Sequence, residues 1–373
     1  MAQYGYGFSN IGTLILISYA LICLFRRNVF LIHKPLLVFV LLISIIQITN
    51  MIIKGQLSAT YFNLFLMPII SIFIIGASIG EINFQKLYRV YSIVGTIAML
   101  IIYYQWVRLF LFDILPDPIK ILPESTGAYY SWAQAEYRPS SLFSEPQAYA
   151  SYILPLLIMS LHKKSYIFSL AILLSIIFSG STAGIVLSGI VFTYYLFRIN
   201  EQWIVKISFV VVFSILAYLS LNTNVFSSQQ SKIRSIDYAT DIRLAKGFQI
   251  FGTFNLEEML FGIGNGPNGL IEYNLRHESE LTSMNIFDLG DYVTSVSGVL
   301  IYYGIFAGFF YFWFFYKLFQ QEDPKMRILL LVIIISSFGQ TLLFNGFFLL
   351  FYITYFGICD KVSFNKNYLS VRF

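Results

Sequence analysis

Arg138 opens a nine-residue segment, Arg138 to Pro146 (RPSSLFSEP), whose residue types suit the binding of an anion. Proline is favoured at the first position of a helix and Ser144 or Glu145 can cap it, so the segment predicts a helix that starts at Pro146. A helix start carries free N–H groups and a partial positive charge, to which Arg138 adds a fixed cation. These features suit a phosphate or diphosphate. A capped helix beside an interfacial arginine explains them without a ligand.

A second group of charges lies between Arg234 and Lys246. If this segment is helical, Arg243 and Lys246 lie one turn apart on one face, because residues three apart are neighbours on a helix. Arg234, Asp237 and Asp241 fall on the opposite side, where they neutralise one another. The first face is a candidate anion site, and a solvated helix of mixed charge is the alternative.

His277, Glu278 and Glu280 could bind a metal ion, and His277 could serve as a general base. Short loop clusters of this kind are mostly solvated, and the chain contains no Asp-x-Asp pair, so we expect no metal. Residues 261–269 (FGIGNGPNG) are rich in glycine but lack the strand–helix context of a nucleotide-binding loop, which favours a tight turn and no cofactor.

Aromatic residues, including Trp132 and Tyr137, gather in the segment before Arg138. Such rings can stack on sugars, and an aromatic belt at a membrane surface predicts the same residues. Arg108, near the end of an apolar run, can reach the same surface or join an anion site.

The chain that carries these residues has 373 amino acids, of which 57% are apolar, 18% aromatic and only 12% charged. A soluble domain has about 25% charged residues, so this composition excludes an ordinary soluble enzyme, a disordered chain and a disulfide-stapled secreted domain. The net charge of +5 comes from short basic clusters between apolar runs, which argues against nucleic acid as a partner.

The apolar runs have the length that crosses a bilayer, which predicts an all-α polytopic membrane protein with about eleven transmembrane helices (about 10–12). We expect spans at residues 9–25, 35–53, 61–79, 90–112, 145–161, 165–180, 182–198, 203–221, 293–316, 327–341 and 343–358. Residues 165–198 would make one helix of about 50 Å, too long for a core of about 30 Å, so we place a hairpin at Gly180. A second break is expected between Gln340 and Gly346.

Charge asymmetry orients these spans. With Arg26, Arg27 and Lys34 in the cytoplasm, the inner segments hold 15 of the 24 basic residues and the outer segments 14 of the 19 acidic ones. Basic residues are enriched in cytoplasmic loops, so the amino terminus is expected outside and the carboxyl terminus inside. A single transmembrane domain, residues 1–373, then carries two long, partly helical extracytoplasmic loops, residues 113–144 and 222–292.

Five segments carry a resemblance to a known family. They are residues 138–150, with Phe-x-Glu-Pro and alanine after Arg138; 178–184 (FSGSTAG); 241–243, with Arg243; 260–264, with a Gly-x-Gly turn; and 294–308. In this order they resemble the bacterial O-antigen polymerase and ligase superfamily, specifically the Wzy-type polysaccharide polymerases. Val293 stands where ligase-type members carry a histidine upstream of the glycine equivalent to Gly304, which favours a polymerase.

The resemblance implies a metal-independent glycosyltransferase, multi-pass in the bacterial inner membrane, without a cofactor. The donor would be a growing glycan on undecaprenyl diphosphate, and the acceptor a lipid-linked oligosaccharide repeat unit of O-antigen or capsule. Arg138 and Arg243 would stabilise the departing diphosphate, an effect worth about 3–4 kcal/mol for one well-placed donor. Glu145 or His277 would accept the proton of the acceptor hydroxyl.

Further residues would assist in this site. Arg108 and Lys246 would help to bind the diphosphate, and Tyr137 and Trp132 the sugar; Asp237 and Asp241 are further candidates for the base. Besides the lipid-linked oligosaccharides and the bilayer, a chain-length regulator and a flippase are candidate partners.

Two other functions stay open from the sequence. A ligase would pass the glycan to lipid A core or another acceptor. A lipid-linked oligosaccharide flippase would need polar groups along a transmembrane cavity, whereas the spans hold only scattered ones, Gln47, Asn50, Gln105, Gln340 and Asn345.

Overall fold

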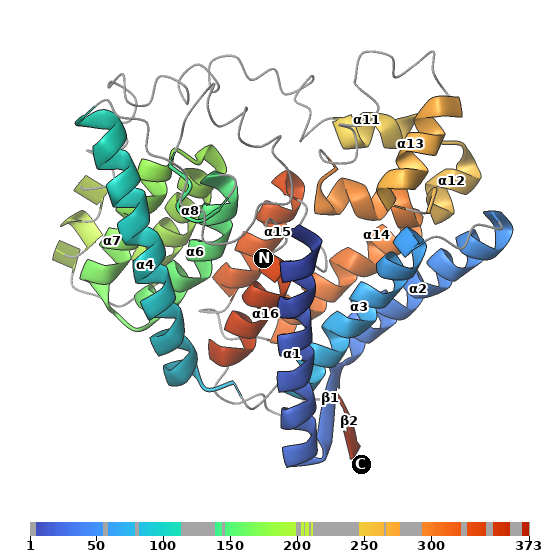
Figure 1. Ribbon diagram of the computed structural model, residues 1–373, viewed down its shortest axis with the longest axis horizontal. Helices are drawn as coiled ribbons and strands as arrows, with labels where there is room; N and C mark the ends of the chain where they lie inside the picture. The colour runs from blue at the N-terminus through green and yellow to red at the C-terminus, as the bar shows by residue number, and fades with distance from the viewer. Residues whose placement is uncertain are drawn as a thin grey trace. The chain divides into compact units, whose positions relative to one another are not determined.

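Helices make up most of the structure, a computed structural model of the chain (Figure 1). It describes residues 5–54, 59–78, 82–112, 139–143, 146–198, 203–204, 206–208, 210–211, 246–264, 266–276, 293–321, 327–340, 346–358 and 368–372. The helices and strands are α1 (Gly5–Arg27), β1 (Val29–His33), α2 (Lys34–Lys54), α3 (Ala59–Ser78), α4 (Phe84–Phe110), α6 (Pro146–His162), α7 (Tyr166–Ser179), α8 (Thr182–Arg198), α11 (Lys246–Gly252), α12 (Leu256–Phe261), α13 (Gly266–Arg276), α14 (Ser295–Gln321), α15 (Arg327–Gly339), α16 (Gly346–Ile358) and β2 (Tyr368–Arg372). They fall into two compact units: unit 1 holds Met1–Ile11 and Phe84–Ile236, and unit 2 holds Gly12–Asn83 and Asp237–Phe373.

Three of the described helices are long and apolar enough to cross a membrane. They are Lys34–Ile53 in α2, Phe84–Leu109 in α4 and Ser295–Gln320 in α14, and shorter apolar helices accompany them. On α4, Val90, Ile93, Ile97 and Leu100 are at least 50% exposed along one side, where a water-soluble protein would place polar residues. A mostly helical membrane protein is thus confirmed in outline, while the number of spans stays a prediction.

Unit 1 contains the hairpin that the sequence predicts. α7 ends at Ser179 and α8 begins at Thr182. Between them Gly180 has φ 67°, a left-handed conformation that favours glycine, and its N–H donates to the carbonyl of Ile177 at 2.9 Å. The break is therefore confirmed, and its cause is a glycine that ends one helix.

Hydroxyl groups join the helices of unit 1. The Tyr149 hydroxyl of α6 donates to Ser175 Oγ of α7 at 2.6 Å, and the hydroxyls of Ser160 and Ser169 lie 2.7 Å apart. Lipid tails offer no hydrogen bonds, so polar side chains of this kind hold neighbouring helices together.

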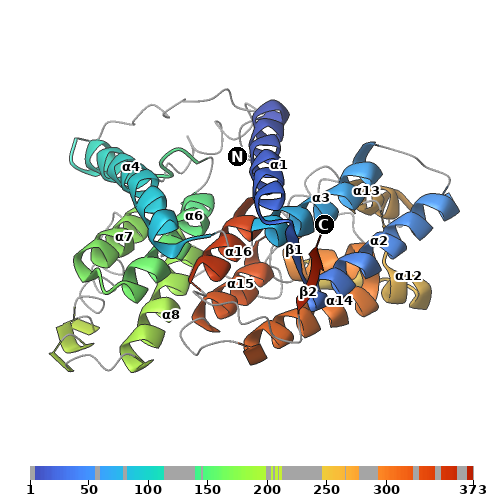
Figure 2. The same cartoon turned by 90° about the horizontal axis from the view of Figure 1, so that it is seen from below.

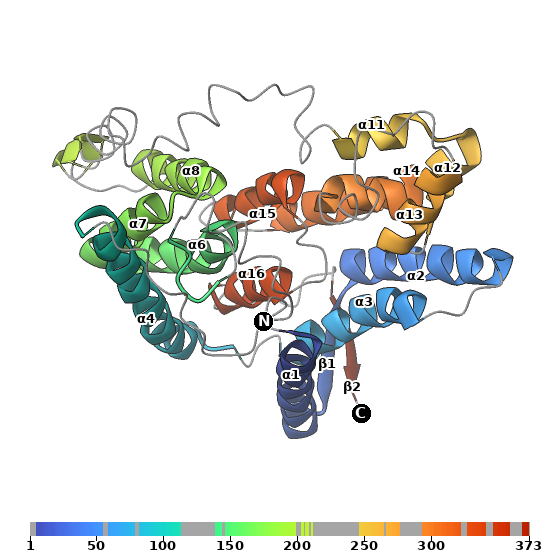
Figure 3. The same cartoon turned by 45° about the horizontal axis from the view of Figure 1, so that its top comes forward.

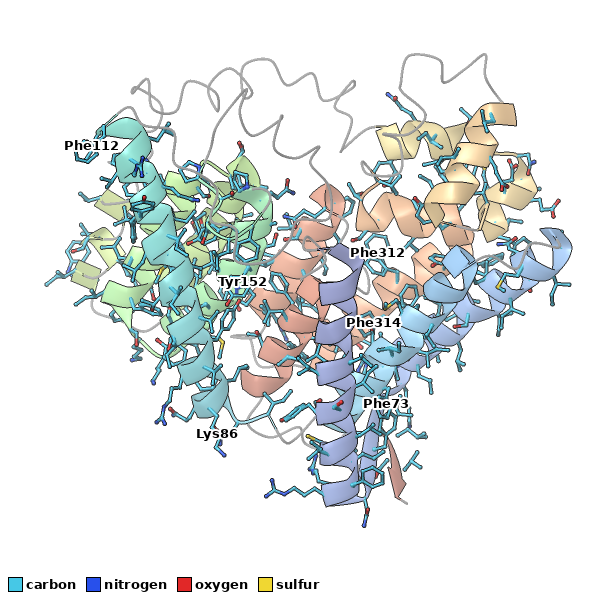
Figure 4. All side chains as sticks on the ribbon, viewed as in Figure 1. Phe73, Lys86, Phe112, Tyr152, Phe312 and Phe314 are labelled. Atoms are coloured by element: carbon cyan, nitrogen blue, oxygen red, sulfur yellow. The ribbon has the colours of Figure 1, made fainter. Side chains whose placement is uncertain are left out.

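Cationic side chains gather at one end of α4. Figure 4 places Lys86 and Phe112 at its opposite ends. At the Lys86 end, Lys163 Nζ, from the turn between α6 and α7, lies 4.4 Å from the centre of the Tyr88 ring. Further along, the Tyr91 hydroxyl donates to the carbonyl of Tyr152 on α6. The two basic segments predicted to be cytoplasmic thus share one end of unit 1.

In unit 2, α2 packs antiparallel to α14 and beside α3 (Figure 3). The ring of His33 lies 5.7 Å from that of Phe314, and Phe39 lies 5.6 Å from Tyr311. As the residue number rises on one helix it falls on the other, so the carboxyl end of α2 lies toward the start of α14.

A two-stranded sheet, which the sequence analysis does not predict, joins β1 and β2 (Figure 2). The strands are antiparallel, with Val29 opposite Arg372 and His33 opposite Tyr368. Pairing between residues so far apart in the chain leaves no local sequence signal. Because paired strands lie about 4.8 Å apart, the segment after α1 and the carboxyl-terminal segment lie together.

The span expected at residues 293–316 falls in α14, whose segment Ser295–Gln320 is long and apolar enough to cross a membrane, and α14 contains a break that the sequence analysis does not predict. α14 has a non-helical residue at Gly304, with φ 80° and ψ −179°. Such a break frees backbone groups, and here the carbonyls of Ile301 and Tyr302 accept hydrogen bonds from the N–H groups of Ile263 (2.8 Å) and Gly264 (3.1 Å). The glycine-rich turn between α12 and α13 is therefore hydrogen-bonded to α14 through its backbone. We call these two hydrogen bonds the clip.

Residues 246–276 are partly helical, as expected within the loop 222–292. α11, α12 and α13 lie together over the first half of α14 (Figures 1 and 3). Their apolar side chains form one buried cluster with those of α14 and of the residues just before it: Ile250, Phe254, Ile263, Leu270, Tyr273, Val293 and Ile301. Val293 is thus a core residue of this cluster.

Replacing Gly304 by alanine is expected to destabilise the protein. The backbone conformation of Gly304 is one that essentially only glycine adopts, at a cost of about 1–3 kcal/mol for other residues. A β-carbon there would also meet the carbonyl of Leu260. We expect a lower midpoint of thermal unfolding in detergent for Gly304→Ala. Gly339→Ala is the control, because a β-carbon at Gly339 has no atom within 4 Å; equal midpoints for both variants would show that the clip is not needed.

Candidate functional site

Most of the residues that the sequence singles out lie outside the described part of the chain. They are Trp132, Tyr137, Arg138, Glu145, Arg243 and His277, together with Asp237, Asp241, Glu278 and Glu280. Their roles stay predictions. Of the others, Lys246 is the first residue of α11 and Arg108 lies in the last turn of α4. The predicted helix start at Pro146 is confirmed by α6.

The segment directly after Arg138 is fixed to α4 by a pair of hydrogen bonds. The side chain of Gln105 donates from Nε2 to the carbonyl of Ser141 at 3.2 Å and accepts at Oε1 from the Ser141 N–H at 2.8 Å. Ser141 Oγ donates to the carbonyl of Ala98 at 2.8 Å. Gln105 and Ser141 are 2% and 4% exposed. We call this arrangement the Gln105 clamp.

The clamp holds a backbone conformation that is unfavourable by itself. Ser141 has φ 58°, in the left-handed region that a residue with a side chain rarely adopts. The turn is closed by the Phe143 N–H, which donates to the carbonyl of Ser140 at 3.0 Å. The ring of Phe143 lies 5.1 Å from that of Tyr152 and 6.1 Å from that of Tyr149, both on α6. The segment 139–143 is therefore seated between α4 and α6.

Arg108 lies one turn beyond Gln105 on α4, which places it on a neighbouring part of the same face. Its Nη1 donates to the hydroxyl of Tyr104 at 2.9 Å, and its guanidinium carbon lies 5.8 Å from the centre of that ring. Nε is buried and makes no hydrogen bond within the described residues. A guanidinium has five N–H donors, so this cation retains capacity for an anion.

Aromatic packing fixes this end of α4 to α7. Trp106 stacks on Phe178 with ring centres 4.5 Å apart, and the hydroxyl of Tyr103 donates to the carbonyl of Ala171 at 2.6 Å. Arg108 and Gln105 therefore lie at an end of α4 that is packed against α7, which limits the movement of the Arg108 guanidinium. A fixed cation beside an ordered loop can bind an anion with little loss of conformational freedom.

Gln105 is the residue that sequence reasoning undervalued. It counts there only as one of several scattered polar groups within the spans, although a buried amide in a membrane helix needs a partner. Its position one turn before Arg108 is the signal available in the sequence. Its partner, a backbone unit 36 residues away in the chain, has no such signal.

No family model matches the chain, and no curated protein matches it. Its function has to be inferred from the chemistry of its own residues.

Loss of the Gln105 clamp is expected to destabilise the protein. Gln105→Leu would leave the buried N–H and C=O of Ser141 without partners, at a cost of about 1–3 kcal/mol for each group. We expect a lower midpoint of unfolding, read by size-exclusion chromatography after heating. Gln320→Leu is the matched control, because Gln320 is exposed on α14 and donates to Tyr316. A Gln105→Leu protein as stable as this control would contradict a structural role for the clamp.

Proposed function

We propose that the chain is a polysaccharide polymerase of the bacterial inner membrane. It would transfer a growing glycan from undecaprenyl diphosphate onto a lipid-linked repeat unit at the outer face. The observation that carries the proposal is the Gln105 clamp, which seats Pro139 to Phe143 on the end of α4 that holds Arg108. Arg138 directly precedes this segment in the sequence and is proposed as a second cation of the site.

The proposed topology has eleven spans, with the amino terminus outside and the carboxyl terminus inside. Two contacts support it. Lys163 lies over Tyr88, which joins two basic segments at one end of unit 1. The β1–β2 pairing joins the segment after α1 to the carboxyl-terminal segment of unit 2. Both contacts unite segments that the charge pattern assigns to the cytoplasm. The opposite end of α4, with Arg108, is then the outer end.

The reaction needs charge stabilisation more than any other assistance. The acceptor hydroxyl oxygen attacks the anomeric carbon of the donor sugar, the bond from that carbon to the diphosphate oxygen breaks, and undecaprenyl diphosphate leaves with added negative charge. Arg138 and Arg243 are proposed to stabilise that charge, and Arg108 and Lys246 to assist. Glu145 or His277 is proposed to take the hydroxyl proton.

Removal of either principal arginine should abolish chain growth. One lost donor to developing charge reduces turnover by about 10²–10³-fold, so Arg138→Ala and Arg243→Ala should each leave only short surface glycans. The readout is the length distribution of surface glycan in cells of the natural host that lack the native copy. Membrane insertion, followed by a carboxyl-terminal tag, should be unchanged.

Arg234→Ala is the control for charge alone, because Arg234 lies on the self-neutralising side of the predicted helix and should leave glycan length unchanged. Long glycans in both Arg138→Ala and Arg243→Ala cells would refute the assignment. Loss of all glycan from the final acceptor, with long chains still held on the lipid carrier, would instead identify a ligase.

Chain growth should continue in the presence of chelators. The proposed site stabilises the diphosphate with side-chain cations, so a divalent metal has no required role there. Polymerisation by washed membranes in EDTA should match that of untreated membranes. Inhibition that a divalent ion reverses, and that His277→Ala also produces, would assign a metal to the cluster of His277, Glu278 and Glu280.

A further inference from the structure

α2 carries polar side chains with buried atoms that make no hydrogen bond within the described part of the chain. Ser44, Gln47 and Asn50 follow one another at intervals of three residues, so each is a neighbour of the next, in a row that winds partly around the helix. Gln47 is 1% exposed, and neither its Oε1 nor its Nε2 makes a hydrogen bond to any residue that the structure describes. Ser44 Oγ and Asn50 Nδ2 are also buried and unbonded. We call these three residues the α2 polar row.

Two contacts fix the level of this row against α14. Asn50 packs on the backbone of Gly264, where a β-carbon would lie 2.7 Å from Asn50 Nδ2. The N–H of Gly264 in turn donates to the carbonyl of Tyr302. Phe39 lies eleven positions before Asn50 on α2. It contacts Tyr311, which lies more than two turns after Tyr302 on α14. The carboxyl end of α2 is therefore level with the residues just before the break in α14.

Gln47 lies one turn from Asn50 in the direction of Phe39, about 4.5 Å along the axis at about 1.5 Å per residue. That step carries it from the level of Tyr302 to the level of Gly304, where α14 is broken. Irregular backbone within a membrane helix occurs where protein encloses it or where it faces a polar cavity, and broken helices often build binding sites. An unbonded amide at the level of such a break points to a ligand.

We propose that the α2 polar row is a binding site for neutral hydroxyl groups at the break of α14. Its side chains are uncharged and combine donors (two amide N–H₂ groups and a hydroxyl) with acceptors (the Gln47 carbonyl and the same hydroxyl). A metal cation would need acceptors alone, and an anion donors alone. A hydroxyl group both donates and accepts. Because Gln47 is almost completely enclosed, the group that it binds is small: water, or a single hydroxyl of a sugar.

The direction in which one substitution shifts the midpoint of unfolding tests the proposal. Gln47→Met keeps the volume and removes the polar atoms. If hydroxyl groups occupy the site, the variant leaves them unpaired and the midpoint of unfolding falls. If no water or ligand is bound to the amide, removing this unsatisfied polar group leaves the midpoint of unfolding unchanged or raises it. That result would overturn the proposal. Gln320→Met, at an exposed position of α14, is the control and should change nothing.

A double-mutant cycle asks whether the row holds a shared ligand. Ser44 and Gln47 make no hydrogen bond to each other, so without a bridging group the effects of Ser44→Ala and Gln47→Met on the unfolding midpoint should add. A shared ligand makes them non-additive, because the second substitution has less left to remove. Strict additivity would contradict a common site.

A lipid probe identifies the source of the hydroxyl groups, and it does not depend on polymerase activity. The protein is placed in phosphatidylcholine nanodiscs with and without monoglucosyl diacylglycerol. Stabilisation of the wild type by the glucolipid, lost in Gln47→Met, assigns the site to a sugar. Equal midpoints with and without the glucolipid, together with a lowered midpoint for Gln47→Met, assign it to bound water. The proposal would be overturned if the glucolipid still stabilised Gln47→Met and if, without glucolipid, the unfolding midpoint of Gln47→Met were no lower than that of the wild type.

Discussion

Backbone groups within hydrocarbon must find hydrogen-bond partners inside the protein, and the connections between several described segments follow from that constraint. Two places show it most clearly. In unit 1 the amide of Gln105 supplies both hydrogen bonds of a loop residue, Ser141. In unit 2 the carbonyls that the break in α14 frees accept hydrogen bonds from Ile263 and Gly264. Each bond joins a membrane helix to a segment from the long connections, so the same contacts that satisfy the helices also order those segments.

These hydrogen bonds between helices and loop segments give the proposed glycosyl transfer a physical basis. A polymerase acting on lipid-linked sugars needs cations at the membrane surface that do not have to reorganise when charge develops on the diphosphate. Arg108 stands on a helix end that the Trp106–Phe178 stack and the hydrogen bond from Tyr103 to Ala171 hold against α7. The loop residues after Arg138 are seated beside that helix rather than extended into solvent. A surface reaction on a membrane-bound substrate requires loop segments that are seated on the spans in this way.

The sequence predicts those features of the fold that depend on the pattern of neighbouring residues. The membrane class, the helix start at Pro146 and the hairpin at Gly180 follow from apolar length, proline preference and glycine conformation, and the structure agrees with each. The break at Gly304 was missed because the residues around it are uniformly apolar, and only the distant Gly264 segment explains it. The β1–β2 pairing and the partner of Gln105 were missed for the same reason: each joins positions far apart in the chain. Of the candidate site residues, the described part of the chain places only Arg108 and the start of α11.

Polymerisation by the purified protein tests the central proposal most directly. The chain is reconstituted in liposomes with undecaprenyl-diphosphate-linked repeat units as the only glycan, and the products are separated by size. We expect a ladder of lengthening glycans on undecaprenyl diphosphate, with free undecaprenyl diphosphate released at each step. Repeat units that stay single, or that only cross the bilayer unchanged, would contradict a polymerase.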